Sequence, residues 1–484
     1  MKSHSLVFNS IFNVIYKVLN ILFPLVTAAY IARIIESKLI GEIAFAQNIT
    51  QYFVLLAALG LPNYGTREIA KTRDQKEASC KVFSELFLLN AISTTVCLLI
   101  YCILVISIPT IRNHAVLFLI TGIHVVLNYI NVDWLYQGLE QYRYIAVRSF
   151  IVKLISLFLI LVFVRSSSDY LFYALISALA LAGNNIYNVL HLKKMGIELQ
   201  VNNIEIKKHL GPVISLLCTT LAIELYTLLD TTMIGILCTK DNVAFYNYAM
   251  RITKSVIAMI AAIGGVLLPR LSYYRGKNDL DACKSVVKKT LDVLIYLLTP
   301  SAVGIALCSG EIILFLYGEN FSQSIPILRI SAILVVTLGF SNLFGTQILI
   351  TFGKENRLLI ATVVGAISNI CLNWFLIPRY QGVGAVVASV ISETLVTITT
   401  FCFAKSCMSI SISKKNFIIS ILSCVAMTGV LFILKGIVHN CSVLLITEVV
   451  TGAALYTVLT LIMKNSVAID IVNRIIGRLR RSIS

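Results

Sequence analysis

The chain has 484 residues, of which 58% are hydrophobic and only 13% are charged. A soluble domain of this length normally carries about 25% charged residues. These figures therefore exclude an ordinary soluble enzyme, a disordered chain and a disulfide-rich secreted scaffold. Lys and Arg number 40 against 23 Asp and Glu, a formal charge of +17. In a membrane protein this excess indicates basic cytoplasmic loops before it indicates nucleic acid.

Apolar runs of helical length follow one another almost to the C-terminus. Each is close to the roughly 20 residues that a membrane-spanning helix needs, and none alternates as barrel strands do. We therefore predict an all-α, polytopic membrane protein with about 14 transmembrane helices. The predicted spans lie near 9–31, 41–61, 82–108, 115–137, 147–164, 169–191, 211–237, 243–268, 288–316, 325–352, 357–377, 383–404, 416–435 and 442–463.

Basic residues are distributed unevenly between the predicted loops. With the N-terminus inside, about 29 of the 40 fall on the cytoplasmic side, including Arg148 and Lys153, and about 8 fall outside. This asymmetry predicts that both termini are cytoplasmic. Lys17, Arg251 and Lys254 remain inside predicted spans.

The two halves resemble each other at an offset of about 200 residues, as in many transporters. Ala44-Phe45 opens the second predicted span and Ala244-Phe245 opens the eighth. Because six spans separate the two, the repeats are expected to be parallel. The predicted domains are a six-helix lobe at 1–210, a second six-helix lobe at 211–410, and two further helices with a basic tail at 411–484. A central cavity between the lobes would hold the site; chance similarity between apolar segments is the alternative.

Polar side chains recur at helical spacing inside three predicted spans. Charges in lipid usually face a cavity or a partner, so a cationic cavity attractive to an anionic substrate is expected. Snorkelling of the lysines to an interface is the alternative. The candidate substrate-binding residues are Lys17, Arg251, Lys254, Asn13, Asn247 and Gln51.

Acidic residues within the spans are candidates for coupling to an ion gradient. Glu224 lies near mid-span with no obvious partner one turn away, so it could carry a proton or bind Na⁺. Asp230 is the second candidate, and a buried ion pair with Arg251 is its alternative. Glu311 and Glu393 could simply lie near span ends.

Enzyme signatures such as Gly-rich phosphate loops, HExxH and GxSxG are missing from the sequence, and its six histidines are scattered. We therefore expect neither an enzyme nor a metal site, and no cofactor.

Two motifs resemble known transporters. The run from Asp133 to Ala146 (DWLYQGLEQYRYIA) resembles a signature of bacterial O-antigen flippases, the Wzx family, although Trp134 alone could be an interface anchor. The stretch from Asn369 to Glu393 is typical of polysaccharide exporters in the wider MOP superfamily, which includes MATE drug transporters and the lipid II flippase.

The resemblance implies two six-helix lobes around a cationic cavity. It implies an undecaprenyl-pyrophosphate-linked oligosaccharide as substrate, moved from the cytoplasmic to the periplasmic leaflet of the inner membrane. Membrane lipid, an O-antigen polymerase and a chain-length regulator are the candidate partners, and nucleic acid is not expected. The pyrophosphate would meet Lys17, Arg251 or Lys254.

Two other functions remain open at this stage. A MATE-type drug exporter would require a cavity lined mainly by acidic residues, because its substrates are cations. In this sequence, basic residues are at least as prominent within the spans. An O-antigen polymerase would be expected to show a large outer loop rich in Arg, whereas the predicted outer loops are short.

Overall fold

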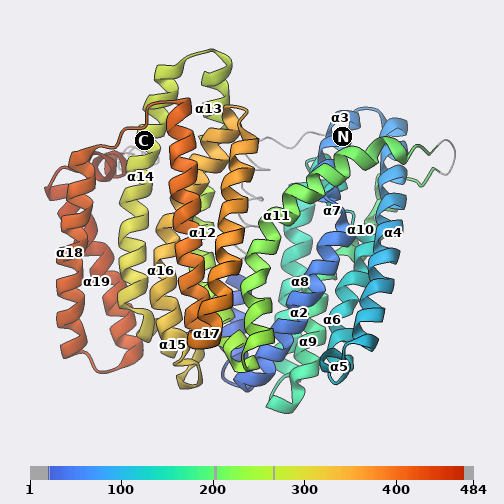
Figure 1. The fold of residues 1–484 in the computed structure, drawn as a ribbon, viewed down its shortest axis with the longest axis horizontal. Helices are drawn as coiled ribbons and strands as arrows, with labels where there is room; N and C mark the ends of the chain where they lie inside the picture. The colour runs from blue at the N-terminus through green and yellow to red at the C-terminus, as the bar shows by residue number, and fades with distance from the viewer. Residues whose placement is uncertain (1–19, 21, 201–203, 265–266, 474–484) are drawn as a thin grey trace, which may run out of the picture. The chain divides into compact units, whose positions relative to one another are not determined.

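The structure is a computed structural model that describes residues 20, 22–200, 204–264 and 267–473. These residues are almost entirely helical and include no strand, which confirms the all-α class. The chain divides into two compact units, Met1–Ala244 and Phe245–Ser484. Figure 1 shows the helices of each unit. The predicted division at 210 and 410 stays a prediction.

The first unit is built on α2, which packs against α4, α6, α9 and α11. Short helices connect the long ones: Pro62 lies in the first turn of α3 and Pro109 opens α5, positions where the missing N–H of proline costs no hydrogen bond. The helices of this unit are Leu22–Ile31, α2 (Ser37–Ala58), α3 (Leu61–Thr72), α4 (Lys76–Ser107), α5 (Pro109–Arg112), α6 (Ala115–Leu127), α7 (Asp133–Gly138), α8 (Tyr142–Phe163), α9 (Tyr170–Ala182), α10 (Asn184–Met195) and α11 (Lys207–Leu237).

The second unit repeats this order of elements, with a short helix after each of the first two long helices. In it α16 packs against α14 and α17, and α18 packs against α14 and α19. Asn440 begins α19 by accepting hydrogen bonds from the N–H groups of Ser442 and Val443. The helices are α12 (Lys240–Gly264, which begins in the first unit), α13 (Leu267–Gly276), α14 (Leu280–Leu307), α15 (Ser309–Tyr317), α16 (Ser324–Ser341), the π-helix η4 (Asn342–Leu349), α17 (Glu355–Cys407), α18 (Lys414–Ile437) and α19 (Cys441–Ile462).

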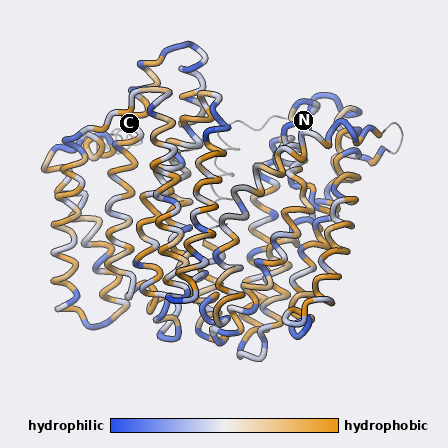
Figure 2. Tube along the Cα trace, viewed as in Figure 1, coloured by the Kyte–Doolittle hydropathy of each residue, from blue (hydrophilic) through white to orange (hydrophobic). Residues whose placement is uncertain are grey.

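Nine helical segments in the described part of the chain are long and apolar enough to cross a membrane. Figure 2 shows apolar residues along these helices and hydrophilic residues concentrated where helices end. Many large apolar side chains on them are exposed, as expected of a surface that faces lipid. The protein is therefore a multi-pass membrane protein, and the exact number of 14 spans stays a prediction.

The longest element, α17, is two helices joined at a break. Gln381 has φ 53° and ψ −131°, outside the helical region. The break falls between the predicted spans 357–377 and 383–404, so both spans were predicted at the positions of the two helices that α17 contains. Pro378 lies three residues before it, where a proline ends a regular helix.

Candidate functional site

The motif that begins at Asp133 includes α7, which packs against α3 in the first unit. Trp134 is buried in a cluster with Phe83 and Tyr64, and its ring lies against the backbone of Gly65 on α3. A Cβ at Gly65 would stand 2.6 Å from the Trp134 ring. Trp134 is therefore a packing residue of α7, and the alternative of an interface anchor is wrong.

A buried cation lies next to Asp133, the first residue of this motif. Arg148, on α8, has only 3% of its side chain exposed, and its Nη1 lies 3.0 Å from Oδ1 of Asp133. The same Nη1 donates to Oδ1 of Asn188 on α10. Within the described residues, Nε and Nη2 of Arg148 have no hydrogen-bond partner. Arg148 thus lies inside a helix long and apolar enough to span a membrane. Its predicted place on the cytoplasmic side stays a prediction.

Lys153 is a second buried cation of α8. Lys153 lies about 16 Å along the helix axis from Tyr142, at a rise of 1.5 Å per residue. Its Nζ donates to Oδ1 of Asn20 and lies 5.9 Å from the ring centre of Phe23. Asn20 is three residues after Lys17, and the spacing of Asn9, Asn13, Lys17 and Asn20 in the sequence predicts that they share one helical face. Asn20 therefore lies beside a cation of α8. The predicted place of Lys153 on the cytoplasmic side stays a prediction.

A third charged group ties α4 to the start of α11. Glu85 is fully buried and its Oε2 lies 2.9 Å from Nε2 of His209 and 3.0 Å from Nζ of Lys208. His209 Nδ1 lies 2.8 Å from the hydroxyl of Tyr64. Burial alone would lower the pKa of Lys208, but its hydrogen bonds to Glu85 and Glu205 outweigh this and raise that pKa. The carboxylate is fully paired, so this group is structural.

Three of the predicted site residues lie on α12. Asn247 and Arg251 are half-buried and Lys254 is exposed. The guanidinium of Arg251 lies 5.3 Å from the ring centre of Tyr248. Since the three residues are spaced four and three apart, they share one face of this helix.

Three others lie on α2 and α11 of the first unit. Gln51 is half-buried on α2, and Asp230 is buried on α11. Glu224 is half-buried, and the Thr227 hydroxyl lies 3.0 Å from its carbonyl and 3.4 Å from its Oε2. Glu224 therefore has a partner three residues on, where none was expected. The side chain of Asn48 on α2 donates to the hydroxyl of Thr232 at 2.7 Å, so α2 and α11 pack through polar contacts next to Asp230.

The predicted site residues fall into separate groups. Gln51, Glu224 and Asp230 belong to the first unit, while Asn247, Arg251 and Lys254 belong to the second. Lys17 and Asn13 lie outside the described residues. Convergence of the cations on one cavity, and the Asp230–Arg251 pair, stay predictions.

Long apolar helices with charged side chains buried inside them define a polytopic membrane transporter. Residues 6–275 match the model of the family described as "Polysaccharide biosynthesis protein", and 216–375 match the MatE model. Because the first match covers more than half of the chain, the protein belongs to the polysaccharide biosynthesis protein family. It is a transporter of the MOP superfamily, not an enzyme, and the resemblance to O-antigen flippases is confirmed.

Individual proteins agree with this placement. An Escherichia coli protein described as "Putative O-antigen transporter" is 23% identical over 402 residues, which cover 81% of this chain and 96% of that one. The lipid II flippase MurJ in an inward closed conformation superposes with a TM-score of 0.73 at 16% identity, covering 95% of this chain and 99% of MurJ. An inward-facing MATE multidrug transporter superposes with a TM-score of 0.62 at 14% identity, covering 80% of this chain and 94% of the transporter. These two structures establish the fold.

Proposed function

We propose that this protein is a flippase for lipid-linked O-antigen units. Its substrate is an undecaprenyl-pyrophosphate-linked oligosaccharide, moved from the cytoplasmic to the periplasmic leaflet of the bacterial inner membrane. The observation that carries the proposal is Lys153, a buried ammonium inside an apolar helix, next to the neutral amide of Asn20. The name of the E. coli relative supports the class of substrate.

The charge of Lys153 has no counter-ion from the protein within the described residues. Among the described residues the polar partner of its Nζ is the amide oxygen of Asn20, not a carboxylate, and the remaining segments of the sequence contain no Asp or Glu. A lone cation at the centre of a membrane helix costs about 3 kcal/mol or more. An anionic pyrophosphate would offset this cost, because ammonium and phosphate groups form strong charge-assisted hydrogen bonds.

The proposed transport cycle is alternating access. Alternating access, with the lobes rocking about a site near mid-membrane, is the mode expected of repeat-built transporters. Lys17, Arg251 and Lys254, with Asn13, Asn247 and Gln51, would complete the binding surface. Both termini would be cytoplasmic, and membrane lipid, an O-antigen polymerase and a chain-length regulator would be the partners. Coupling to H⁺ or Na⁺ would act through Glu224 or Asp230.

Complementation of a flippase-deletion strain of the host that makes the O unit tests the proposal. The readout is the O-antigen ladder on a gel, at matched protein levels in the membrane. We expect Lys153→Gln to reduce the ladder severely, because Gln keeps a polar side chain, shorter by one atom, and removes the charge. Lys415→Gln, an exposed position at the start of α18, is the matched control and should leave the ladder intact. A normal ladder from Lys153→Gln would reject the anion site.

The cations of α12 are tested in the same strain. Arg251→Ala should shorten the ladder more than Lys254→Ala, since Arg251 is the more buried of the two. A normal ladder with Arg251→Ala would remove this residue from the mechanism. Dissipating the proton or sodium gradient separately then tests coupling, and a ladder that persists under both treatments would exclude it.

A further inference from the structure

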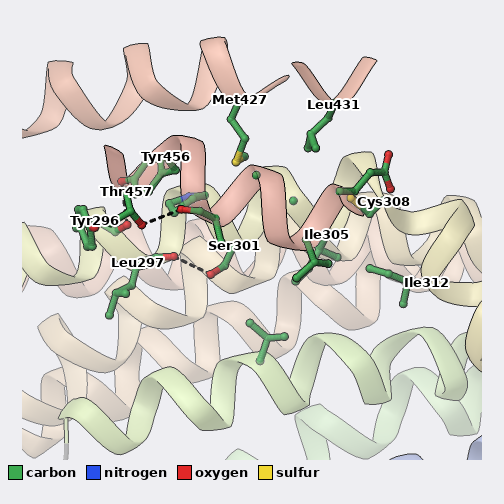
Figure 3. A pocket seen from close by; sticks show the side chains of 17 residues that line it. Tyr296, Leu297, Ser301, Ile305, Cys308, Ile312, Met427, Leu431, Tyr456 and Thr457 are labelled. Atoms are coloured by element: carbon green, nitrogen blue, oxygen red, sulfur yellow. Dashed lines mark hydrogen bonds between the residues drawn. The ribbon is translucent and has the colours of Figure 1, made fainter. Parts of the chain in front are cut away.

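The second unit contains a partly open cavity of about 400 Å³ lined by residues of α12, α14, α15, α18 and α19. Its wall is mostly apolar, with Ile305, Met427 and Leu431 among the lining residues (Figure 3). Pro300 and Gly304 leave space along α14, because neither carries a long side chain. None of the described residues considered above for substrate binding lines this cavity, although Val256 of α12 does.

One ionisable side chain in the wall of this cavity is a carboxyl group. Glu448, on α19, lines the cavity and is only 1% exposed. Neither of its carboxylate oxygens has a hydrogen bond within the described part of the chain. A buried, ionised carboxylate without hydrogen bonds is very costly, and such a group normally becomes neutral instead.

The nearest cation, Lys435, is already engaged with another acid. Its Nζ lies 2.7 Å from Oε1 of Glu311 and 2.8 Å from the carbonyl oxygen of Leu307. The distance from this Nζ to Oε1 of Glu448 is 3.6 Å, within ion-pair range but too long for a hydrogen bond. The sequence suggested that Glu311 simply lies near a span end. In the structure it forms an ion pair with Lys435.

The group therefore contains two carboxyl groups and one ammonium. The other titratable side chains near Glu448 are Cys308 on the α14–α15 connection, Cys441 on α19, and the tyrosines Tyr296 and Tyr456. None of them supplies a positive charge. With both acids ionised, this buried group would carry one excess negative charge in a medium of low dielectric constant.

We propose that Glu448 is a proton-binding site: in the folded protein its carboxyl group holds a proton at neutral pH, while Glu311 stays ionised as the partner of Lys435. Binding one proton converts the Glu448 carboxylate to the neutral acid and brings the net charge of the group from −1 to 0. A metal cation fits this cavity less well, because hard cations need six or more oxygen ligands and the wall is mostly apolar.

The site joins elements that lie far apart in the sequence. Glu311 belongs to α15, Lys435 to α18 and Glu448 to α19. Loss of the proton would create a second anion beside Lys435, which would then be shared between two acids. We therefore expect the packing of α18 and α19 against α15 to respond to pH through this carboxyl group.

Infrared pH-difference spectroscopy on the full-length protein in lipid tests the proposal directly, because it detects the C=O band of a protonated carboxyl group. We expect such a band at pH 7, and we expect it to vanish in Glu448→Gln. Glu319→Gln, which removes an exposed glutamate of the same unit, is the matched control and should keep the band. A band that persists unchanged in Glu448→Gln, or no band in the wild-type protein, would overturn the proposal.

Two further variants make the result independent of whether Glu448→Gln folds. Glu448→Asp retains an acid with a shorter side chain and should shift the band without abolishing it. Glu311→Gln frees Lys435 to pair with Glu448, so Glu448 should ionise and the band should be lost. A band unaffected by both variants would show that the proton lies elsewhere.

Discussion

The carboxylate of Asp133 lies 3.0 Å from the guanidinium of Arg148, but the two side chains differ tenfold in exposure, 30% against 3%. Removing the acid therefore leaves a fully buried cation, whereas removing the arginine leaves an acid that water can reach. We expect Asp133→Asn to destabilise the protein by about 3 kcal/mol, the cost of an unpaired buried charge. Arg148→Met should lower the free energy of unfolding by less, because methionine is an apolar side chain that can fill this buried position.

Thermal unfolding of the purified variants in detergent measures this difference. The double variant, Asp133→Asn with Arg148→Met, should be more stable than Asp133→Asn alone, since the unpaired cation is gone. If Asp133→Asn were the milder of the two single variants, the pair would not be held by the burial of Arg148.

Glu85 and Lys208 form an ion pair with the same asymmetry in the opposite sense. Glu85 is fully buried and also accepts hydrogen bonds from His209 and from the backbone N–H of Glu205, while Lys208 is 44% exposed. We expect Glu85→Gln to destabilise the protein by about 3 kcal/mol, because several donors lose a charged acceptor. Lys208→Gln should cost less than about 1 kcal/mol, as for other exposed ion pairs. Equal shifts in melting temperature would contradict this assignment.

The close contact between Gly65 and Trp134 makes a prediction about packing. Gly65→Ala adds a methyl group 2.6 Å from the Trp134 ring and should cost about 1–3 kcal/mol through overpacking. Gly429, in α18, has open space around its Cα, so Gly429→Ala should be neutral or stabilise the helix by up to about 1 kcal/mol. The two alanine variants are matched chemically, and unfolding measurements should separate them in sign. A neutral Gly65→Ala would mean that α7 can move away from α3.

Hydropathy alone predicted most of the helical framework. In lipid, the backbone polar groups of a run of about 20 apolar residues can be satisfied by a helix. The fold class therefore follows from the composition, and the span positions follow from where the apolar runs lie in the sequence. The break at Gln381 was also predictable, because Pro378 and Gly382 interrupt the apolar run there. The motif at 133–146 identified the family.

The buried charges were harder to place. The predicted fifth span began at 147, whereas α8 begins at Tyr142, so Arg148 lies inside the helix and not at its start. A hydropathy profile also gives no sign of the buried partners, such as Asn188, that hold a charged side chain inside a helix. The partner of Lys435 is 124 residues away in the sequence, at Glu311, and no local spacing reports such a contact.

The break in α17 offers a test of backbone strain. Gln381 has φ 53° and ψ −131°, a conformation that favours glycine because a Cβ is crowded there. We expect Gln381→Gly to stabilise the folded protein by about 1 kcal/mol, because the relieved strain exceeds the added entropy of the unfolded chain. Gln381→Ala retains the Cβ and should bring no gain, so it serves as the control in the same thermal unfolding series. If both variants shifted the melting temperature equally, the side-chain contacts of Gln381 rather than its backbone would set the stability of the break.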